Sequence, residues 1–232
     1  MNDKVKGFVL SSIDYKENDV LLRVVTKEYG ILSLVAKSSK KLTSKNHFLN
    51  MCIYEFIIDY IDNKTIFSIH NAKLVNNYFD DKDIIMMAFK NLLCEACLKN
   101  EDISTFDEME FIFSHLNNQN KYLLGCLFFS YLMKQFGISP NVDSCTVCKN
   151  LKVVSISNRF GGFVCLNHLN GEKPLEVDRL KKFRLIVKAS FNNYDVISQF
   201  NYDINDFKSV ADFYIENADI HLKSYDFYLS LC

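Results

Sequence analysis

Two short pairs of potential metal ligands constrain this chain more than any other feature. Two residues separate Cys145 from Cys148, and sixteen residues later Cys165 and His168 repeat that spacing. Such a pair fits one tight turn around a tetrahedral ion, and a second pair on a facing hairpin closes the coordination shell. Four protein ligands leave no open position for chemistry, whereas a catalytic zinc keeps three ligands and a water. The spacing therefore predicts one structural Zn2+ that holds this segment folded.

Other interpretations of these residues are a redox-active dithiol, or four core residues that never bind a metal. A thioredoxin-like pair follows a strand and opens a helix, whereas Cys145 follows Pro140 and a polar loop. A zinc deaminase needs His-x-Glu upstream and Pro directly before the Cys pair, and neither is present. Turn-forming residues at 141–144 and at Gly161-Gly162 favour the zinc site.

The composition is typical of a folded protein without a membrane-spanning segment. Of 232 residues, 49% are hydrophobic and 24% are charged, which leaves no low-complexity tail. The longest apolar run, residues 122–133, is much shorter than the ~20 residues that cross a bilayer, and the N-terminus lacks signal-peptide features. We therefore expect a cytoplasmic protein whose other cysteines are reduced and mostly buried. These are Cys52, Cys94, Cys97, Cys126 and Cys232.

The hydrophobic period changes near residue 80. Before it, apolar residues alternate as in strands, at 6–12, 20–26, 31–37, 51–60 and 65–71. After it, helical periodicity covers about 83–98, 106–116, 121–136, 178–190, 204–217 and 221–231. Five short strands suffice for an OB-type barrel, a fold that binds single-stranded nucleic acid or sugars. The sequence thus predicts an α+β protein with an OB-fold barrel domain at 1–79 and an α-helical domain at 80–232, interrupted by a zinc-binding insertion at 138–172.

The charges are unevenly distributed along the chain. The net charge of −1 gives no global attraction to nucleic acid. Residues 1–79, however, carry 11 Lys and Arg against 8 Asp and Glu, and the remaining residues carry 16 against 20. The expected loop between the third and fourth strands contains four lysines and no acid within residues 37–45. Flexible cations beside aromatic residues fit a nucleic-acid groove, and an ordinary solvated loop is the alternative.

A second basic cluster occupies residues 179–188, which contain no acid. Its members are Arg179, Lys181, Lys182, Arg184 and Lys188. Leu180, Phe183 and Val187 take the core face of the expected helix, so that some of the cations must face solvent. The cluster is either a solvated helix face or a surface for a partner or a second nucleic-acid track.

Eight short segments match one known protein family in order and spacing. They are Gly7-Phe-Val-Leu10, Glu17-Asn-Asp19, Thr26-Lys-Glu-Tyr-Gly30, Ala36-Lys37, Gly137-Ile-Ser-Pro140, Cys145-Thr-Val-Cys148, Phe160-Gly-Gly-Phe-Val-Cys165 and His221-Leu-Lys-Ser224. With them, the chain resembles the RecO family of bacterial recombination mediators along nearly its whole length. Ser38 and Lys149 depart from the family pattern, which has glycine there, and His168 replaces a frequent cysteine, an exchange that zinc accepts.

The resemblance implies a non-enzymatic, cytoplasmic and nucleoid-associated mediator of DNA recombination. It implies binding of single- and double-stranded DNA, annealing of strands coated by single-stranded-DNA-binding protein (SSB), and cooperation with RecR in loading RecA. A basic barrel face is expected to contact the phosphates. The expected contacts are Arg23, Lys37, Lys40, Lys41 and Lys45. The 179–188 cluster is the expected site for the SSB tail, because an acidic tail with an apolar end suits cations beside exposed hydrophobic residues.

Two other functions remain open from the residues alone. A zinc-containing accessory factor of transcription or translation would use the same barrel and metal insertion. A zinc hydrolase would need an open metal position and a nearby general base. Strand annealing without nucleotide, measured together with metal content, distinguishes the three.

Overall fold

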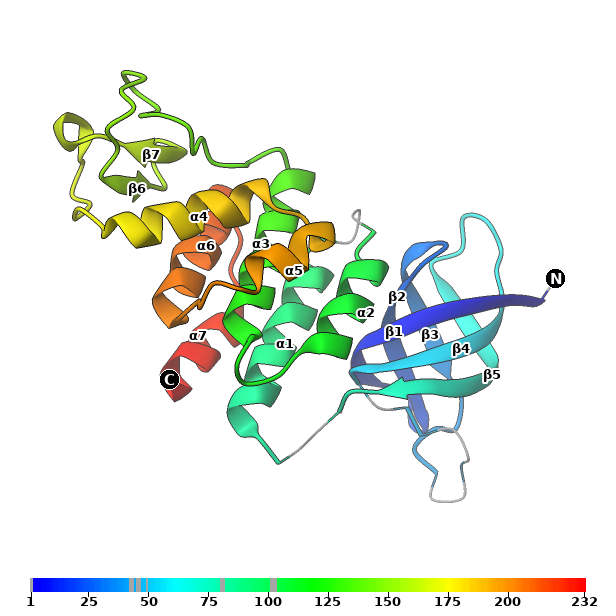
Figure 1. Ribbon diagram of the computed structural model, residues 1–232. Helices are drawn as coiled ribbons and strands as arrows, with labels where there is room; N and C mark the ends of the chain where they lie inside the picture. Colours follow the sequence, from blue (N-terminus) through cyan, green and yellow to red (C-terminus); the bar gives the residue numbers. More distant parts are fainter. Residues whose placement is uncertain (1, 42–43, 45–46, 49, 80–81, 101–103) are drawn as a thin grey trace. The chain divides into compact units, whose positions relative to one another are not determined.

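The computed structural model describes residues 2–41, 44, 47–48, 50–79, 82–100 and 104–232. The chain forms two compact units, whose elements are labelled in Figure 1. Unit 1 comprises Met1–His115 and Leu222–Cys232, and unit 2 comprises Leu116–His221. The domain bounds expected from the sequence follow the change of hydrophobic period and stay a prediction. In the ranges given above, no helix combines the length and the apolar character that a membrane crossing needs.

Unit 1 contains a closed five-stranded barrel, as the alternating sequence predicts. Its strands are β1 (Asn2–Tyr15), β2 (Asp19–Thr26), β3 (Gly30–Ala36), β4 (Cys52–Asp59) and β5 (Ile66–Asn77). They close in the order β1-β2-β3-β5-β4, and all neighbours are antiparallel except β3 and β5. The protein is therefore an α+β protein with an OB-like barrel.

Alternate side chains of the strands fill the barrel. The buried interior includes Val5, Val9, Leu22, Val24, Leu32, Leu34, Phe56, Ile58 and Phe67. Successive side chains of a strand point to opposite faces. Arg23, between two interior residues of β2, therefore lies on the outer face of the barrel.

The first and last strands are longer than the alternation suggested. β1 begins at Asn2 and β5 continues to Asn77, where Asn76 and Asn77 still pair with Ile53 and Cys52 of β4. The β4–β5 register also shifts twice, between residues 53 and 54 and between 57 and 58. Polar strand ends and register shifts interrupt the two-residue period, so these extensions carry no clear sequence signal.

Three helices complete unit 1: α1 (Ile84–Leu98), α2 (Phe106–His115) and α7 (Lys223–Leu231). Asp83 caps α1 by accepting a hydrogen bond from the Met86 amide, as expected. The carboxylate of Glu95 on α1 accepts hydrogen bonds from the amides of Lys223 and Ser224, and thus caps α7. Burial alone would raise the pKa of Glu95, but the hydrogen bonds from Ser224 and Lys223 lower it. The last helix is therefore anchored to α1, far away in sequence.

Unit 2 is built around α3 (Lys121–Gln135), which packs on α4 (Val177–Lys188) and α6 (Ile204–Asn217). Asp203 caps α6 by accepting hydrogen bonds from the amides of Asn205 and Asp206. The short elements β6 (Ser155–Ser157), β7 (Gly162–Val164), η1 (Leu166–His168), η2 (Phe191–Asn193) and α5 (Tyr194–Ile197) complete it. The long helices match the expected ranges within a few residues, whereas elements of three or four residues are too short to show periodicity.

A close backbone approach organises the insertion between α3 and α4. The Asn141 amide donates to the Gly161 carbonyl over 3.0 Å, and the Phe163 amide donates to the Asn141 carbonyl over 2.8 Å. At Gly162, with φ of 143°, an added Cβ would lie 2.3 Å from the Asn141 carbonyl oxygen. Gly161 has φ of 70°, and a Cβ added there would have no atom within 4 Å. Only glycine fits at 162.

We expect Gly162→Ala to destabilise the insertion much more than Gly161→Ala. The change at 162 combines a forbidden backbone region with a clash against backbone, worth about 2 to 4 kcal/mol. The change at 161 adds only the left-handed cost of about 1 to 2 kcal/mol. Amide hydrogen exchange of residues 141–165 measures the difference. Equal protection in the two variants would contradict the tight Asn141–Gly162 contact.

Candidate metal centre and nucleic-acid interface

The insertion brings the four predicted metal ligands together. The Sγ atoms of Cys145, Cys148 and Cys165 and a ring nitrogen of His168 all lie within 4.8 Å of one another. The Cys148 and Cys165 Sγ atoms are 3.7 Å apart. The His168 Nδ1 atom is 3.6 Å from the Cys145 Sγ and 3.2 Å from the Cys165 Sγ.

Two of these three distances match a tetrahedral zinc shell, and the Cys165–His168 distance is shorter. With Zn–S of about 2.3 Å and Zn–N of about 2.0 to 2.1 Å, tetrahedral geometry separates two sulfur atoms by about 3.8 Å and a sulfur from a nitrogen by about 3.6 Å. The Cys148–Cys165 and Cys145–His168 separations agree with these values. The Cys3His cluster is therefore compatible with a zinc site.

The local backbone turns the first cysteine pair inward. The Cys145 amide donates to the Asn150 carbonyl over 2.8 Å, and the Lys149 amide donates to the Cys145 carbonyl over 2.9 Å. This turn requires φ of 63° at Lys149, the left-handed region that glycine favours. Burial opposes ionisation of Cys145, but hydrogen bonds from the amides of Cys148, Cys165 and Val147 lower its pKa to about 6. A thiolate is the form that binds a metal.

The insertion has very little apolar core of its own. Its buried cluster consists of Cys145, Val164 and Cys165, with Val153 and Leu169 packed against it. Two of the three buried members are thus ligand candidates. So small a core does not hold a loop-rich segment by itself, which is the situation in which a metal supplies folding energy.

The remaining cysteines differ from this cluster. Cys52, Cys94, Cys97 and Cys126 are buried, and Cys232 is exposed. Burial raises the pKa of Cys97 to about 12, although a hydrogen bond with Thr105 acts in the opposite direction. A thiol that stays protonated is a poor metal ligand. The buried positions match the expectation of core cysteines.

The predicted basic loop leaves the barrel where β3 ends. Lys37, Lys40 and Lys41 are exposed, and Lys45 lies outside the described residues. The loop is tied to the β1–β2 hairpin, because the Ser38 amide donates to the Asp19 carboxylate over 2.8 Å and the Lys40 amide to the Asn18 carbonyl over 3.1 Å. Ser38 has φ of 54°, which accounts for the glycine expected there from the family pattern.

Not every lysine of this loop is equally available to a ligand. The Lys40 Nζ atom lies 2.7 Å from the Asp14 carboxylate, and its side chain is 30% exposed. Arg23 is partly buried on the outer face of β2, in register with Ser11 and Ser33.

Sequence reasoning did not single out Lys16, in the β1–β2 turn. Lys16 adopts φ of 52° and its ammonium lies 5.3 Å from the centre of the Tyr15 ring. It precedes by two residues Asn18, whose carbonyl accepts a hydrogen bond from the Lys40 amide. In the sequence its charge is masked by Asp14, Glu17 and Asp19.

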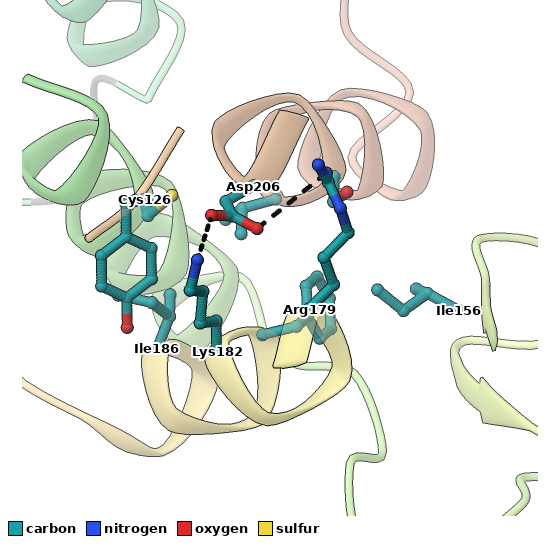
Figure 2. A pocket seen from close by; sticks show the side chains of 10 residues that line it. Cys126, Ile156, Arg179, Lys182, Ile186 and Asp206 are labelled. Carbon is teal, nitrogen blue, oxygen red and sulfur yellow. Dashed lines mark hydrogen bonds and ion pairs between the residues drawn. The ribbon is translucent and has the colours of Figure 1, made fainter. Parts of the chain in front are cut away.

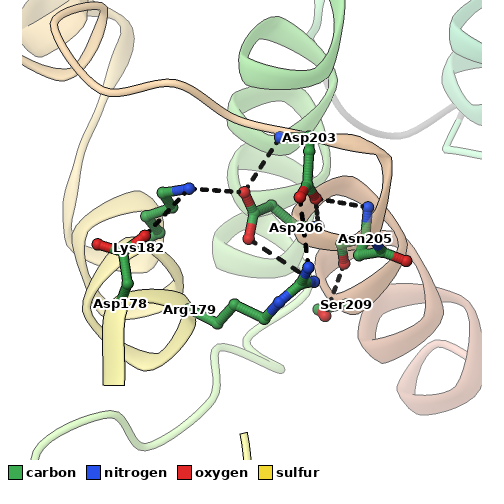
Figure 3. Close-up of polar contacts among 7 residues, drawn as sticks. All are labelled: Asp178, Arg179, Lys182, Asp203, Asn205, Asp206 and Ser209. Carbon is green, nitrogen blue, oxygen red and sulfur yellow. Dashed lines mark hydrogen bonds and ion pairs between the residues drawn. The ribbon is translucent and has the colours of Figure 1, made fainter. Parts of the chain in front are cut away.

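The second predicted cluster is largely engaged in ion pairs within unit 2. In Figure 3 Lys182 reaches Asp178 and Asp206, and Arg179 reaches Asp203 and Asp206. The Lys182 Nζ atom is 3.2 Å from the Asp206 carboxylate, and these side chains are 17% and 5% exposed. Burial alone lowers the pKa of Lys182, but the ion pairs raise it.

The other members of the cluster lie closer to solvent. Arg184 and Lys188 both contact the Asp143 carboxylate, at 2.8 and 2.5 Å. Lys181 is exposed and forms no ion pair with any described residue. Four of the five cations therefore join α4 to α6 or to the start of the insertion.

The cavity beside the buried pair is too small for a ligand. Arg179, Lys182, Ile186 and Asp206 line it, as Figure 2 shows, and its volume is about 10 Å³. One water molecule needs about that much room. The ion pairs here therefore serve packing of α4 on α6.

Comparisons with known proteins agree with the fold and with the order of these features. The family model described as recombination protein O N terminal matches residues 1–78, and the one described as recombination protein O C terminal matches residues 83–218. A DNA repair protein RecO of Mesoplasma florum is 27% identical over 181 residues, which cover 72% of this chain and 67% of the relative. One from Clostridium novyi is 26% identical over 232 residues, or 93% and 88%. One from Listeria welshimeri is 21% identical over 239 residues, or 97% and 93%. The chain therefore belongs to the RecO family of DNA repair proteins.

Proposed function

We propose that this protein is a non-enzymatic mediator of recombinational DNA repair. It binds single- and double-stranded DNA, anneals complementary strands coated by SSB, and with RecR helps to load RecA. Family membership supports this role, whereas no observation favours the alternative of a transcription or translation factor. A cytoplasmic, nucleoid-associated location follows from a DNA substrate. The exposed lysine loop at one end of the barrel is the observation that carries DNA binding.

The physical basis is phosphate neutralisation without occupation of the base edges. Lys37 and Lys41 are exposed, and their flexible ammonium groups suit phosphates. Lys40 is the weaker member, because an incoming phosphate competes with Asp14. Arg23 and Lys45 complete the proposed track. Contacts of this kind carry no base information, so complementary bases remain free to pair, as annealing requires.

We further propose that Cys145, Cys148, Cys165 and His168 hold one structural Zn2+. The tetrahedral separations and the minimal core of the insertion support this assignment. When bound, the ion supplies folding energy and a fixed geometry, and it takes no part in a reaction. The residues 138–172 then form a rigid platform on unit 2.

RecR and the acidic tail of SSB are the proposed protein partners. Among the described residues of α4, Lys181 is the exposed cation that forms no ion pair. Arg184 and Lys188 share only the exposed Asp143 and remain able to exchange it for a partner's carboxylate. Arg179 and Lys182 are held by Asp203 and Asp206. A tail site on α4 therefore centres on Lys181, Arg184 and Lys188.

Neutralising the barrel loop should flatten the salt dependence of DNA binding. In a plot of log affinity against log salt, Lys37→Gln with Lys41→Gln should reduce the slope by about 1.4 for single strands and about 1.8 for duplex. Lys64→Gln with Lys73→Gln removes the same charge elsewhere on unit 1 and is the control. Asp14→Asn frees Lys40 and should steepen the slope. A salt titration that shows the same slope for the loop variant and wild type would place the DNA track elsewhere.

Removing the first cysteine pair should release the metal and loosen the insertion. Cys145→Ser with Cys148→Ser leaves two ligands, and structural zinc contributes about 10 to 16 kcal/mol in small isolated sites. We expect zinc content to fall and residues 138–172 to lose exchange protection. Cys232→Ser is the control for loss of a thiol, and His168→Cys should retain zinc. Full zinc occupancy in the double variant would refute the assignment.

The two kinds of cation on α4 should respond differently to substitution. Lys182→Ala leaves the buried Asp206 carboxylate with Arg179 as its more distant cationic partner. The free energy of unfolding should therefore fall by roughly 3 kcal/mol. Lys181→Ala should change it by less than about 0.5 kcal/mol. Lys181→Ala with Arg184→Ala should weaken binding of an acidic peptide that ends in phenylalanine. Unchanged peptide affinity in a folded double variant moves the tail site away from α4.

A further inference from the structure

The tip of the metal insertion exposes large apolar side chains. Val147, Leu151 and Leu166 are 48%, 79% and 65% exposed. Val147 adjoins Cys148, and Leu166 adjoins Cys165, whose sulfur atoms are 3.7 Å apart. The small core of the insertion does not cover these side chains. Val147 and Leu166 are thus neighbours of adjoining cysteines, and Leu151 follows Cys148 by three residues; an exposed apolar patch marks a surface that a ligand covers. With Lys149 and Lys152 they form the insertion tip.

The lysines of the tip give it a local positive charge. Residues 138–172 contain three Lys and Arg, at 149, 152 and 159, against two acids, Asp143 and Glu172. Asp143 already contacts Arg184 and Lys188 of α4. Attraction of a polyanion to the tip therefore comes from Lys149 and Lys152 themselves.

The cations of the tip are available, in contrast to four of the five on α4. Lys149 and Lys152 are exposed. Neither forms an ion pair with a carboxylate in the described part of the chain, and Lys149 only reaches the Thr146 carbonyl at 3.4 Å. Arg179, Lys182, Arg184 and Lys188 all have carboxylate partners. The tip thus combines free ammonium groups with uncovered apolar groups.

We propose that the insertion tip is a second contact surface for single-stranded DNA. Such a strand offers both phosphates and the apolar faces of unstacked bases, which match Lys149 and Lys152 and the three aliphatic side chains. Duplex DNA offers the phosphates but keeps its base faces covered. The inference rests on the proposed DNA-binding function and adds a surface on unit 2 to the loop on unit 1. Two surfaces in separate units allow the chain to hold two strands, or two segments of one strand.

The charge arm of the test uses fluorescently labelled oligothymidine and salt titration. Lys149→Gln with Lys152→Gln should reduce the slope by about 1.4. Lys173→Gln with Lys208→Gln removes the same charge elsewhere on unit 2 and should leave the slope unchanged. A variant that carries the two tip substitutions together with Lys37→Gln and Lys41→Gln should show the sum of the two slope changes if the two surfaces bind DNA independently.

The apolar arm uses Leu151→Ser with Leu166→Ser. Loss of base contacts should lower affinity for oligothymidine about tenfold without a change of slope, and should affect duplex much less. Zinc content and unfolding temperature must equal those of wild type. Photo-crosslinking of iodouracil-containing strands, mapped by mass spectrometry, should label residues 147–152 or 166 in wild type.

The outcomes separate this inference from the proposed function. If all folded tip variants keep the affinity and the salt slope of wild type, the inference about the tip is wrong. A reduced affinity or slope in the barrel-loop variant would still support the DNA-binding track on the barrel. A loss in the tip variants alone supports the tip and refutes the barrel track. Absence of any single-strand binding by wild type refutes both. If the tip variants lose affinity only for an acidic, phenylalanine-ended peptide, the tip docks a protein and the inference fails.

Discussion

Closure of the barrel is the constraint on which the rest of unit 1 depends. Parallel pairing of β3 with β5 completes a ring that begins as a three-stranded meander. Once the ring closes, alternate residues are committed to its interior and the others to its surface. The β2–β3 pairing, which sets Ala36 opposite Val20, places the loop after β3 beside the β1–β2 hairpin, where Ser38 and Lys40 hydrogen bond to Asp19 and Asn18. The lysines are thus displayed by a backbone that the hairpin holds in place.

Two runs of cations with similar charge differ in role because their side chains differ in burial. The loop after β3 and helix α4 are both runs of cations without acids in sequence. In the loop, the ammonium groups of Lys37 and Lys41 remain in water, where a phosphate is a stronger partner than any neighbour. On α4, Lys182 is taken out of water together with Asp206, at 17% and 5% exposure. A desolvated pair cannot lose one member cheaply, so this cation serves the packing of α4 on α6.

The insertion combines a cluster of four candidate metal ligands with a very small apolar core. Backbone hydrogen bonds between Asn141 and the 161–163 segment require glycine at 162 and set the frame of the hairpin. Within that frame, four candidate ligand atoms lie within 4.8 Å of one another, beside very few buried apolar groups. If the proposed metal holds the segment, its remaining aliphatic residues do not have to be buried. Val147, Leu151 and Leu166 are consequently free for contact with a ligand.

The amino-acid sequence was enough to predict the strands, the long helices and the four members of the Cys3His cluster. Periods of two and 3.6 residues mark the strands and the long helices, and two-residue spacings bring each ligand pair into one turn, since these relations are local. The family pattern, which has glycine at 38 and 149, also anticipated the left-handed backbone there. The tertiary structure alone decided which cations are free. The partners Asp143, Asp203 and Asp206 lie about twenty to forty residues from the α4 cations that they hold. Pairing across such separations follows from packing and leaves no periodic trace in the sequence, so a run of lysines does not reveal which of them face water.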